Sequence, residues 1–382
     1  MWRGVFLAIT TLSWSVDAEP VESTPVRAEE WFVDSTGSVR NFRLEYQRWR
    51  SESRYDPDYL LAALEVSGLV AIGTAQYWLT SKAQSADWDF PPLSERLTLQ
   101  AVRLDNNTFT TNNLLHPMAG LGYYAFSRGS GLSLPEAIFF TETASFLWEA
   151  LLEWRENISF NDMVLTPVGG IAMGEFTFHL ADYLNSGGSS RRQELARWTF
   201  GSPVRLNRSS STAIGSTLPK DALGLSSAYW HRFITQYDFT MLEGERGSSN
   251  TAHGVTLRAE LVSMPGFLRP GKFDTWFADG NFTEASGRMM FGGPTGLQEA
   301  DLWFSSCFAG YYGQDFAKDG ASGIAGMLGV GTALRYLDEV TFEHSEQIAT
   351  AHYLGPHFGL WLAGSGFDLK LIGDVHGDFA AI

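Results

Sequence analysis

The sequence is poor in cysteine and in basic residues. A single cysteine, Cys307, excludes an internal disulfide framework and a zinc site built from several cysteines. The 27 Lys and Arg residues stand against 43 Asp and Glu residues, which gives a formal net charge of -16. Nucleic-acid-binding proteins present a basic surface, so this balance argues against a nucleic-acid partner.

Familiar catalytic signatures are missing as well. No Gly-x-Ser-x-Gly elbow, phosphate-binding glycine loop or dinucleotide fingerprint occurs in a fitting strand–helix context. What the chain does have is 382 residues, of which 44% are hydrophobic and 14% aromatic, together with 39 glycines. This mixture argues against disorder, and the length suffices for a large core and suggests two domains.

The first 18 residues have the features of a secretory signal. Arg3 supplies a positive charge, residues 4–14 are apolar, and residues 16–18 offer a cleavage site. The apolar stretch is too short for an ordinary membrane-spanning helix. We therefore expect residues 1–18 to be a signal peptide, with an ordinary amphipathic start of the chain as the alternative.

The first half of the chain has the patterns of helices. Residues 19–56 are polar and charged, and we expect a tether or a peripheral helix there. Residues 57–200 have helical apolar spacing, and Ser133 with Glu136 forms a capping box at one helix start. We expect this stretch to be a helical domain. Its main helices are predicted over residues 59–79, 133–154 and 161–184.

From residue 201 to residue 382 the hydrophobic period changes to two, the period of β-strands. In residues 367–379, Leu369 and Leu371 fall on one side of a strand, and Asp368 and Lys370 fall on the other. Strands of about ten residues, rich in glycine and aromatics, favour an outer-membrane β-barrel. A soluble periplasmic β-sandwich that binds a ligand is the alternative, although sandwich strands are usually shorter. Further strands are predicted within 233–241, 255–261, 302–312, 328–336 and 348–362.

The predicted fold is therefore α+β in two parts, an N-terminal helical bundle followed by an antiparallel barrel-like sheet of the outer-membrane type. The sequence ends Ala380-Ala381-Ile382. Outer-membrane barrels usually close on a strand that ends in an aromatic residue. We therefore expect a sheet that either lacks its last strand or closes in an unusual way.

The helical half carries too many carboxylates for a bundle that faces lipid. Glu136, Glu142, Glu149 and Glu153 all fall in one predicted helix. An acidic residue at a bilayer centre costs about 2.5–3.5 kcal/mol on insertion scales. We expect this half to lie at the periplasmic face of the outer membrane, with residues 59–79 as the one helix that could insert.

The order of polar and glycine motifs in this half is distinctive. Along the chain run His116-Pro117, Gly120, Tyr123-Tyr124, Arg128, Trp148-Glu149, Glu153, Ser159, Asp162, Gly169-Gly170 and Gly174-Glu175. This run resembles an uncharacterised bacterial domain-of-unknown-function family, number 3943, over residues 112–208. The resemblance implies an exported envelope protein of the outer membrane with no established activity.

Several of these polar residues can come together. Glu142, Glu149 and Glu153 are seven and four positions apart, so on a helix they form one stripe. Buried carboxylates need partners, and His116 and Arg128 are basic residues near them in sequence. The functional hypothesis is a paired-carboxylate site facing His116, and a structural polar network or a solvated helix face is the alternative. The residues of the predicted network are His116, Arg128, Glu142, Glu149, Glu153, Asp162, Thr166 and Glu175.

No residue is assigned a catalytic role from the sequence. Nothing in the pattern identifies an attacking group, so an enzyme is the less favoured reading. The candidates for an acid and a base are His116, Glu149, Glu153 and Asp162. The residues expected to pack helices closely, because they lack side chains, are Gly169, Gly170 and Gly174.

Metal and cofactor sites are not expected. Glu175, His179 and Asp182 share one helix face and have metal-ligand residue types. Solvated faces of this kind are commoner than metal sites, so we predict no metal there. His376 lies on the polar side of a predicted strand, where it is expected to line a lumen rather than to act as a base.

These patterns together predict an exported, outer-membrane-associated protein with a periplasmic helical domain. Its expected role is structural, or the handling of a lipid or a small hydrophobic ligand where helices and barrel meet. Outer-membrane lipid is the expected partner, and the oligomeric state does not follow from the sequence. A membrane-associated hydrolase that uses His116 with the paired carboxylates is the alternative.

Overall fold

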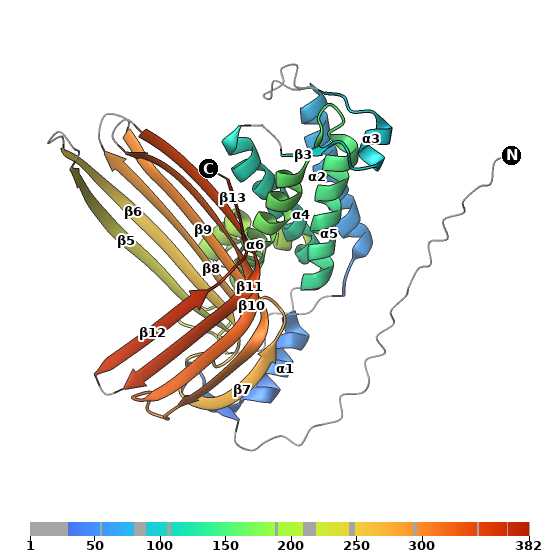
Figure 1. Ribbon diagram of the computed structural model, residues 1–382. Helices are drawn as coiled ribbons and strands as arrows, with labels where there is room; N and C mark the ends of the chain where they lie inside the picture. The colour runs from blue at the N-terminus through green and yellow to red at the C-terminus, as the bar shows by residue number, and fades with distance from the viewer. Residues whose placement is uncertain are drawn as a thin grey trace.

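The computed structural model describes residues 30–53, 56–79, 89–104, 108–187, 190–208, 219–243, 249–292, 296–341, 344–364 and 366–381. The predicted signal peptide, residues 1–18, lies outside these residues. Within them the chain forms a helical region followed by a large antiparallel sheet, as the change of period predicts (Figure 1).

The helices begin largely where the sequence predicts them. The side chain of Asp58 accepts a hydrogen bond from the Leu61 amide at the start of α2. Ser133 and Glu136 form the predicted capping box of α5, and Ser159 caps α6 by accepting from the Asp162 amide. The helices are α1 Phe42–Ser53, α2 Tyr59–Leu79, α3 Leu93–Leu97, α4 His116–Gly129, α5 Leu134–Leu147, α6 Phe160–Asn185, α7 Arg191–Phe200 and α8 Ser202–Arg208, with π-helical turns η1 Thr111–Leu115 and η2 Trp148–Leu152.

Six of the described strands are longer than the expected ten residues. Strands β9 and β11 have 21 residues each, because their alternating pattern continues on both sides of a bulge. The strands are β1 Trp31–Val33, β2 Val39–Asn41, β3 Val102–Arg103, β4 Ile158–Ser159, β5 Tyr229–Glu243, β6 Ser249–Ser263, β7 Gly271–Phe277, β8 Phe282–Gly292, β9 Gly296–Phe316, β10 Gly323–Thr341, β11 His344–Gly364, β12 Phe367–Asp374 and β13 Asp378–Ala381.

Eleven strands form one sheet, and β3 and β4 form a separate parallel pair. The sheet forks at both sides of its three longest strands. Strand β9 pairs with β8 along one half and with β7 along the other, and β11 is shared in the same way by β13 and β12. The sheet does not close (Figure 1). The eleven strands lie in one hydrogen-bonded sheet, whereas a β-sandwich has two stacked sheets.

One predicted strand is divided in two. The alternating pattern of 367–379 predicts a single strand, but β12 ends at Asp374 and β13 begins at Asp378. Residues 375–377 connect them and continue alongside β11. There the Val375 amide donates to the Pro356 carbonyl at 3.0 Å, and the Tyr353 amide donates to the Gly377 carbonyl at 3.0 Å.

The two sides of the sheet differ in chemistry. In each strand, the side chains of alternate residues lie on opposite faces of the sheet. We call the face that carries Leu369 and Leu371 the outer face, and the face that carries Glu260 the inner face. Leu369 and Leu371 lie on the outer face and are 43% and 50% exposed. The inner face carries charged side chains such as Arg232 and Glu260. The outer face is therefore mostly apolar, whereas the inner face combines ion pairs with a buried aromatic cluster that includes Phe273 and Tyr312.

Helices pack on both faces. Helix α6 crosses the outer face midway along the strands, where the Ser306 hydroxyl donates to the Ala172 carbonyl at 3.1 Å. Helix α1 packs against the inner face, where Phe42 stacks on Phe273 with ring centroids 3.8 Å apart. The apolar parts of the outer face beyond α6 remain exposed.

Candidate functional site

The predicted polar residues of the helical region are held together by the crossing of α4 and α6. Three contacts make this crossing tight: Gly170 lies against the backbone of Gly120, Gly174 against the ring of Tyr124, and Gly169 against Pro117. A side-chain carbon at any of these glycines would collide with its neighbour. The three glycines therefore sit at the helix contact, and this contact brings His116 of α4 beside Asp162 and Thr166 of α6.

His116, Glu149 and Asp162 form a compact cluster. His116 Nε2 lies 3.8 Å from Asp162 Oδ2, and His116 Nδ1 lies 3.3 Å from the Thr166 hydroxyl. One potential ligand atom from each of the three residues lies within 4.8 Å of the others. The Glu149 and Asp162 side chains are only 1% exposed. The cluster is therefore almost sealed from solvent.

The charges in this cluster are poorly compensated. Burial raises the pKa of Glu149 well above its usual value, and the nearby charges of Glu153 and Asp162 raise it further. The Ser159 amide donates to Glu149 Oε2 at 3.3 Å, whereas Oε1 has no hydrogen-bond partner among the described residues. The geometry thus favours a protonated Glu149.

Arg96 is a residue of this region that the sequence analysis did not identify. Its buried guanidinium donates to the backbone carbonyls of Glu149, Ala150 and Glu153 at 3.0–3.2 Å, and to that of Glu156. These carbonyls belong to the end of η2 and the turn after it, where a helix leaves acceptors unpaired. No local pattern around residue 96 announces this role, because its partners are more than 50 positions away.

A second buried network lies further along α4 and α6. Arg128 donates to both carboxylate oxygens of Glu175 at 3.0 and 2.9 Å, and the Tyr124 hydroxyl donates to the same carboxylate at 2.5 Å. Glu175 Oε1 also lies 3.1 Å from His179 Nε2. Burial alone would raise the pKa of Glu175, but the charge of Arg128 and the contact with His179 outweigh it and lower the pKa to about 2. Glu175 is therefore ionised at neutral pH.

The structure thus divides the predicted network. It brings His116, Glu149, Asp162 and Thr166 together, with Glu153 as a charged neighbour. It places Arg128 and Glu175 in a separate ion pair. Glu142 is at an exposed position of α5. The expected carboxylate stripe assumed one continuous α-helix, but η2 has a wider π-helical turn that changes the direction of the side chains after Leu147.

The face formed by Glu175, His179 and Asp182 meets the sheet. His179 Nε2 lies 3.2 Å from the Asp279 carbonyl, and the Tyr229 hydroxyl donates to Asp182 at 2.5 Å. These contacts join the end of α6 to β5 and to the turn between β7 and β8. The row of metal-ligand residue types is therefore occupied by hydrogen bonds between the helices and the sheet.

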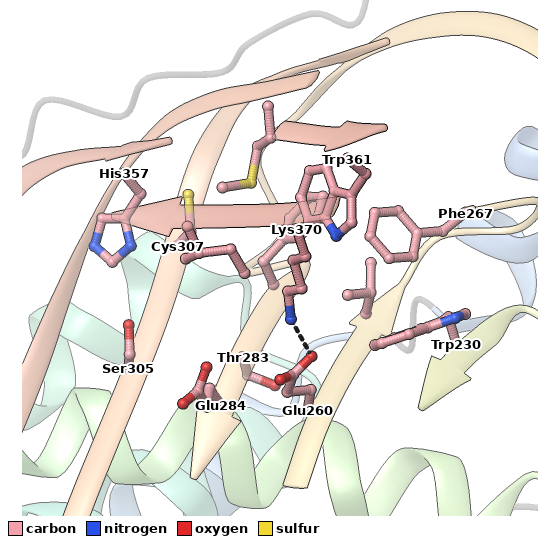
Figure 2. A pocket seen from close by; sticks show the side chains of 14 residues that line it. Trp230, Glu260, Phe267, Thr283, Glu284, Ser305, Cys307, His357, Trp361 and Lys370 are labelled. Atoms are coloured by element: carbon pink, nitrogen blue, oxygen red, sulfur yellow. Dashed lines mark hydrogen bonds and ion pairs between the residues drawn. The ribbon is translucent and has the colours of Figure 1, made fainter. Parts of the chain in front are cut away.

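The inner face of the sheet contains a pocket that the sequence analysis missed (Figure 2). Glu260 of β6 is bound there by Lys370 of β12 at 2.6 Å and by Arg232 at 2.5 Å. Aromatic side chains, Trp230 and Trp361 among them, form the apolar wall of this pocket, which opens to solvent. The charged and apolar walls suit an amphipathic ligand. Alternation of charge along β6 is the only local signal, because Glu260 and Lys370 are 110 positions apart.

One apolar helix and two groups of potential metal ligands also bear on function. Helix α2 is the one helix among the described residues that is long and apolar enough to cross a membrane, judged by length and composition. Two groups of described residues have donor atoms close enough to hold a metal ion. These groups are His116 with Glu149 and Asp162, and His357 with Asp374 and His376.

Comparison with known proteins identifies a family for the helical region. Residues 101–202 match the family described as domain of unknown function (DUF3943). No curated protein and no solved structure matches the chain. The match covers the α4–α6 crossing and both buried polar networks. The resemblance predicted from the motif order is therefore confirmed by a match of residues 101–202 to the model of the DUF3943 family.

Proposed function

We propose that this protein is an exported, outer-membrane-associated protein that handles a lipid or a small amphipathic ligand. The observation that carries the proposal is the difference between the two faces of the long strands. The outer face exposes apolar side chains, and the inner face carries ion pairs beside a buried aromatic cluster. Membrane strands need about 9–11 residues to cross a bilayer, and six of the described strands have 11–21 residues. Strand length and sidedness therefore both suit contact with lipid.

Exposed apolar side chains extend along the outer face on both sides of α6. Soluble monomers rarely expose apolar patches of this extent, and large ones mark contact with a membrane or a partner. On the strands they are Phe233, Tyr237, Phe239, Val255, Leu257, Trp276, Met289, Phe291, Tyr311, Ile324, Leu328, Phe358, Leu369 and Leu371. Aromatic residues are frequent among them, as they are at membrane interfaces.

The inner-face pocket supports the second part of the proposal. Its apolar wall can accept a hydrocarbon or ring system, while Arg232, Arg258 and Lys370 surround Glu260 with positive charge. Glu284 lines the same pocket and pairs with Arg258, so three cations face two carboxylates. The remaining excess of one positive charge favours a ligand with an anionic group. An amphipathic anion, such as a lipid or a fatty acid, has this combination.

Replacing Leu369 with arginine tests contact with lipid. The substitution would place a charge on the outer face, in contact with the bilayer. The free energy of unfolding of vesicle-bound Leu369→Arg should therefore be roughly 2 kcal/mol lower than that of the wild type. Asp368→Arg is the matched control, because Asp368 adjoins Leu369 in β12 but lies on the inner face. The measurement is denaturant unfolding of vesicle-bound protein together with flotation of the vesicles.

Three results support membrane association: flotation of the wild type, a loss of stability in Leu369→Arg and little change in Asp368→Arg. Release of the wild-type protein from cell membranes by a salt wash would contradict the proposal. Equal effects of the two arginine substitutions would contradict it as well, because a soluble sheet has no reason to distinguish the two faces by solvation.

The hydrolase alternative uses the cluster of His116, Glu149 and Asp162. Proximity of an imidazole and two carboxylates favours it. The burial of both carboxylates weighs against it, because a substrate needs access to the acid and the base. A hydrolase would lose turnover of a lipid ester in Glu149→Gln, whereas a structural cluster would change only in stability.

At alkaline pH we expect the Glu149→Gln variant to be more stable than the wild-type protein. Glu149 has a raised pKa in the folded protein because burial and neighbouring carboxylates disfavour its charge. Wild-type stability should therefore fall as the pH rises above the unfolded-state pKa and through the folded-state pKa, and the glutamine variant should lack this decline. Unfolding midpoints measured at several pH values check the sign. Glu95→Gln, at an exposed position of α3, is the control, and a less stable Glu149→Gln at high pH would contradict the expectation.

A further inference from the structure

Three histidines lie close together on the inner face, near the connection between β12 and β13. His357 belongs to β11, and His376 belongs to the connection at 375–377 that divides the predicted strand. Their ring centroids lie 4.9 Å apart, and that of His352 lies 5.3 Å from His376. The connection between β12 and β13 runs alongside β11, and this places His376 beside the histidines of that strand.

Two of these rings carry buried nitrogens that have no hydrogen bond. Nε2 of His357 and Nε2 of His376 are both buried without a hydrogen-bond partner among the described residues. His357 is 6% exposed. A buried polar atom without a partner costs about 1–3 kcal/mol, so a ligand that engages these rings would relieve a cost already present in the fold.

A carboxylate completes the group. Asp374, the last residue of β12, places Oδ2 3.5 Å from His376 Nε2. One donor atom each from His357, His376 and Asp374 lies within 4.8 Å of the others. Asp374 is exposed, so an ion can enter from solvent, and a water molecule can occupy a further coordination position.

We propose that His357, His376 and Asp374 bind one divalent transition-metal ion, with zinc as the best match. Two imidazoles and one carboxylate are a usual ligand set for zinc and related metals, whereas Mg²⁺ and Ca²⁺ prefer sites made of oxygen atoms alone. Zn–N bonds of about 2.0–2.1 Å require the three side chains to move together slightly. The ion links β11 to the connection after β12 and so stabilises the fork of the sheet.

The full-length protein in detergent, stripped of metal with a chelator, tests this site. Titration with Zn²⁺ should show one ion per chain and a higher melting temperature, and Co²⁺ should give the visible absorption of a site with nitrogen ligands. Mg²⁺ and Ca²⁺ should do neither. His376→Ala and Asp374→Asn should each weaken Zn²⁺ binding by about 100-fold, because even partners outside the ligand shell are worth roughly 10–100-fold.

Two controls separate this site from others on the chain. His253→Ala removes a histidine whose ring contacts Tyr237 on the outer face, and it should leave Zn²⁺ affinity unchanged. His116→Ala removes the histidine of the helical cluster and should also leave it unchanged. His376 lies in the connection and Asp374 lies next to it. The variants His376→Ala and Asp374→Asn therefore test the site even if replacement of His357 prevents folding.

Three results would overturn the proposal. The first is the absence of Zn²⁺ binding in the wild-type protein. The second is binding that survives both His376→Ala and Asp374→Asn. The third is binding that is lost in His116→Ala but retained in His376→Ala, which would assign the ion to the helical cluster.

Discussion

Glu175→Gln is expected to lower the free energy of unfolding by about 3–5 kcal/mol, because it leaves the buried guanidinium of Arg128 without its counter-charge. Arg128 donates two hydrogen bonds to Glu175, and both side chains are buried. Glutamine keeps the size of the side chain but cannot balance the charge. Denaturant unfolding of the helical signal measures the change.

Two further variants separate the charge effect from a general loss of packing. Asp315→Asn breaks the exposed pair of Asp315 with Lys272, whose atoms lie 3.2 Å apart, and should change stability by less than about 1 kcal/mol. Combining Arg128→Met with Glu175→Gln removes both members of the buried pair and should recover part of the loss. A Glu175→Gln protein as stable as the wild type would show that the pair does not hold α4 to α6.

The same pair has a pH signature with a definite sign. The pKa of Glu175 falls from an ordinary value of 4.5 to about 2 in the folded protein. The ionised pair therefore stabilises the fold fully above the ordinary pKa, and this contribution is lost as the pH falls through the folded-state value. The stability difference between the wild type and Glu175→Gln should shrink on acidification. A difference that grows toward low pH would contradict this assignment.

Gly120→Val is expected to cost about 3 kcal/mol or more, the upper end of what overpacking does in a core. A side-chain carbon at Gly120 would meet the backbone of Thr166 and Gly170, which cannot turn aside as a flexible side chain can. Helices α4 and α6 would have to separate, and the contact of His116 with Thr166 would be lost with them. Thermal unfolding and the near-ultraviolet circular dichroism of the helical region measure the effect.

Gly68→Val in α2 is the matched control for this substitution. It too lies within a helix, but nothing occupies the space within 4 Å of the added carbon. Valine at this place should leave stability almost unchanged, because only the small difference in helix propensity applies. Similar losses in the two variants would mean that valine acts through the helix backbone and not through the α4–α6 contact.

Local patterns were enough to predict much of the fold. The period of two placed strands at β5, β6 and β9 to β11, and the capping residues Ser133 and Ser159 placed the starts of α5 and α6. The same patterns predicted elements that are more continuous than those in the structure. They predicted one strand over 367–379 and one carboxylate stripe along a single helix. The regular pairing with β11 is interrupted at 375–377, and the helix changes to a π-helical turn at Trp148.

For the candidate sites the sequence identified residue types but not partners. His116 and Asp162 do come together, yet Arg128 pairs with Glu175 and takes no part in the cluster of Glu149. Arg96, the pocket around Glu260 and the grouping of His357 with His376 were not identified. Arg96 and the pocket depend on contacts between segments that are distant along the chain. The two histidines meet where the connection between β12 and β13 lies alongside β11.

The sequence by itself determined the helical half, the alternating half and the division of each strand into a polar and an apolar side, because these follow from spacing over a few residues. The tertiary structure alone decided which carboxylate meets which cation and which side of the sheet α6 covers. It also decided where the sheet forks. Those outcomes depend on the crossing of α4 and α6 at glycines and on strand register, which bring together atoms that no local pattern relates.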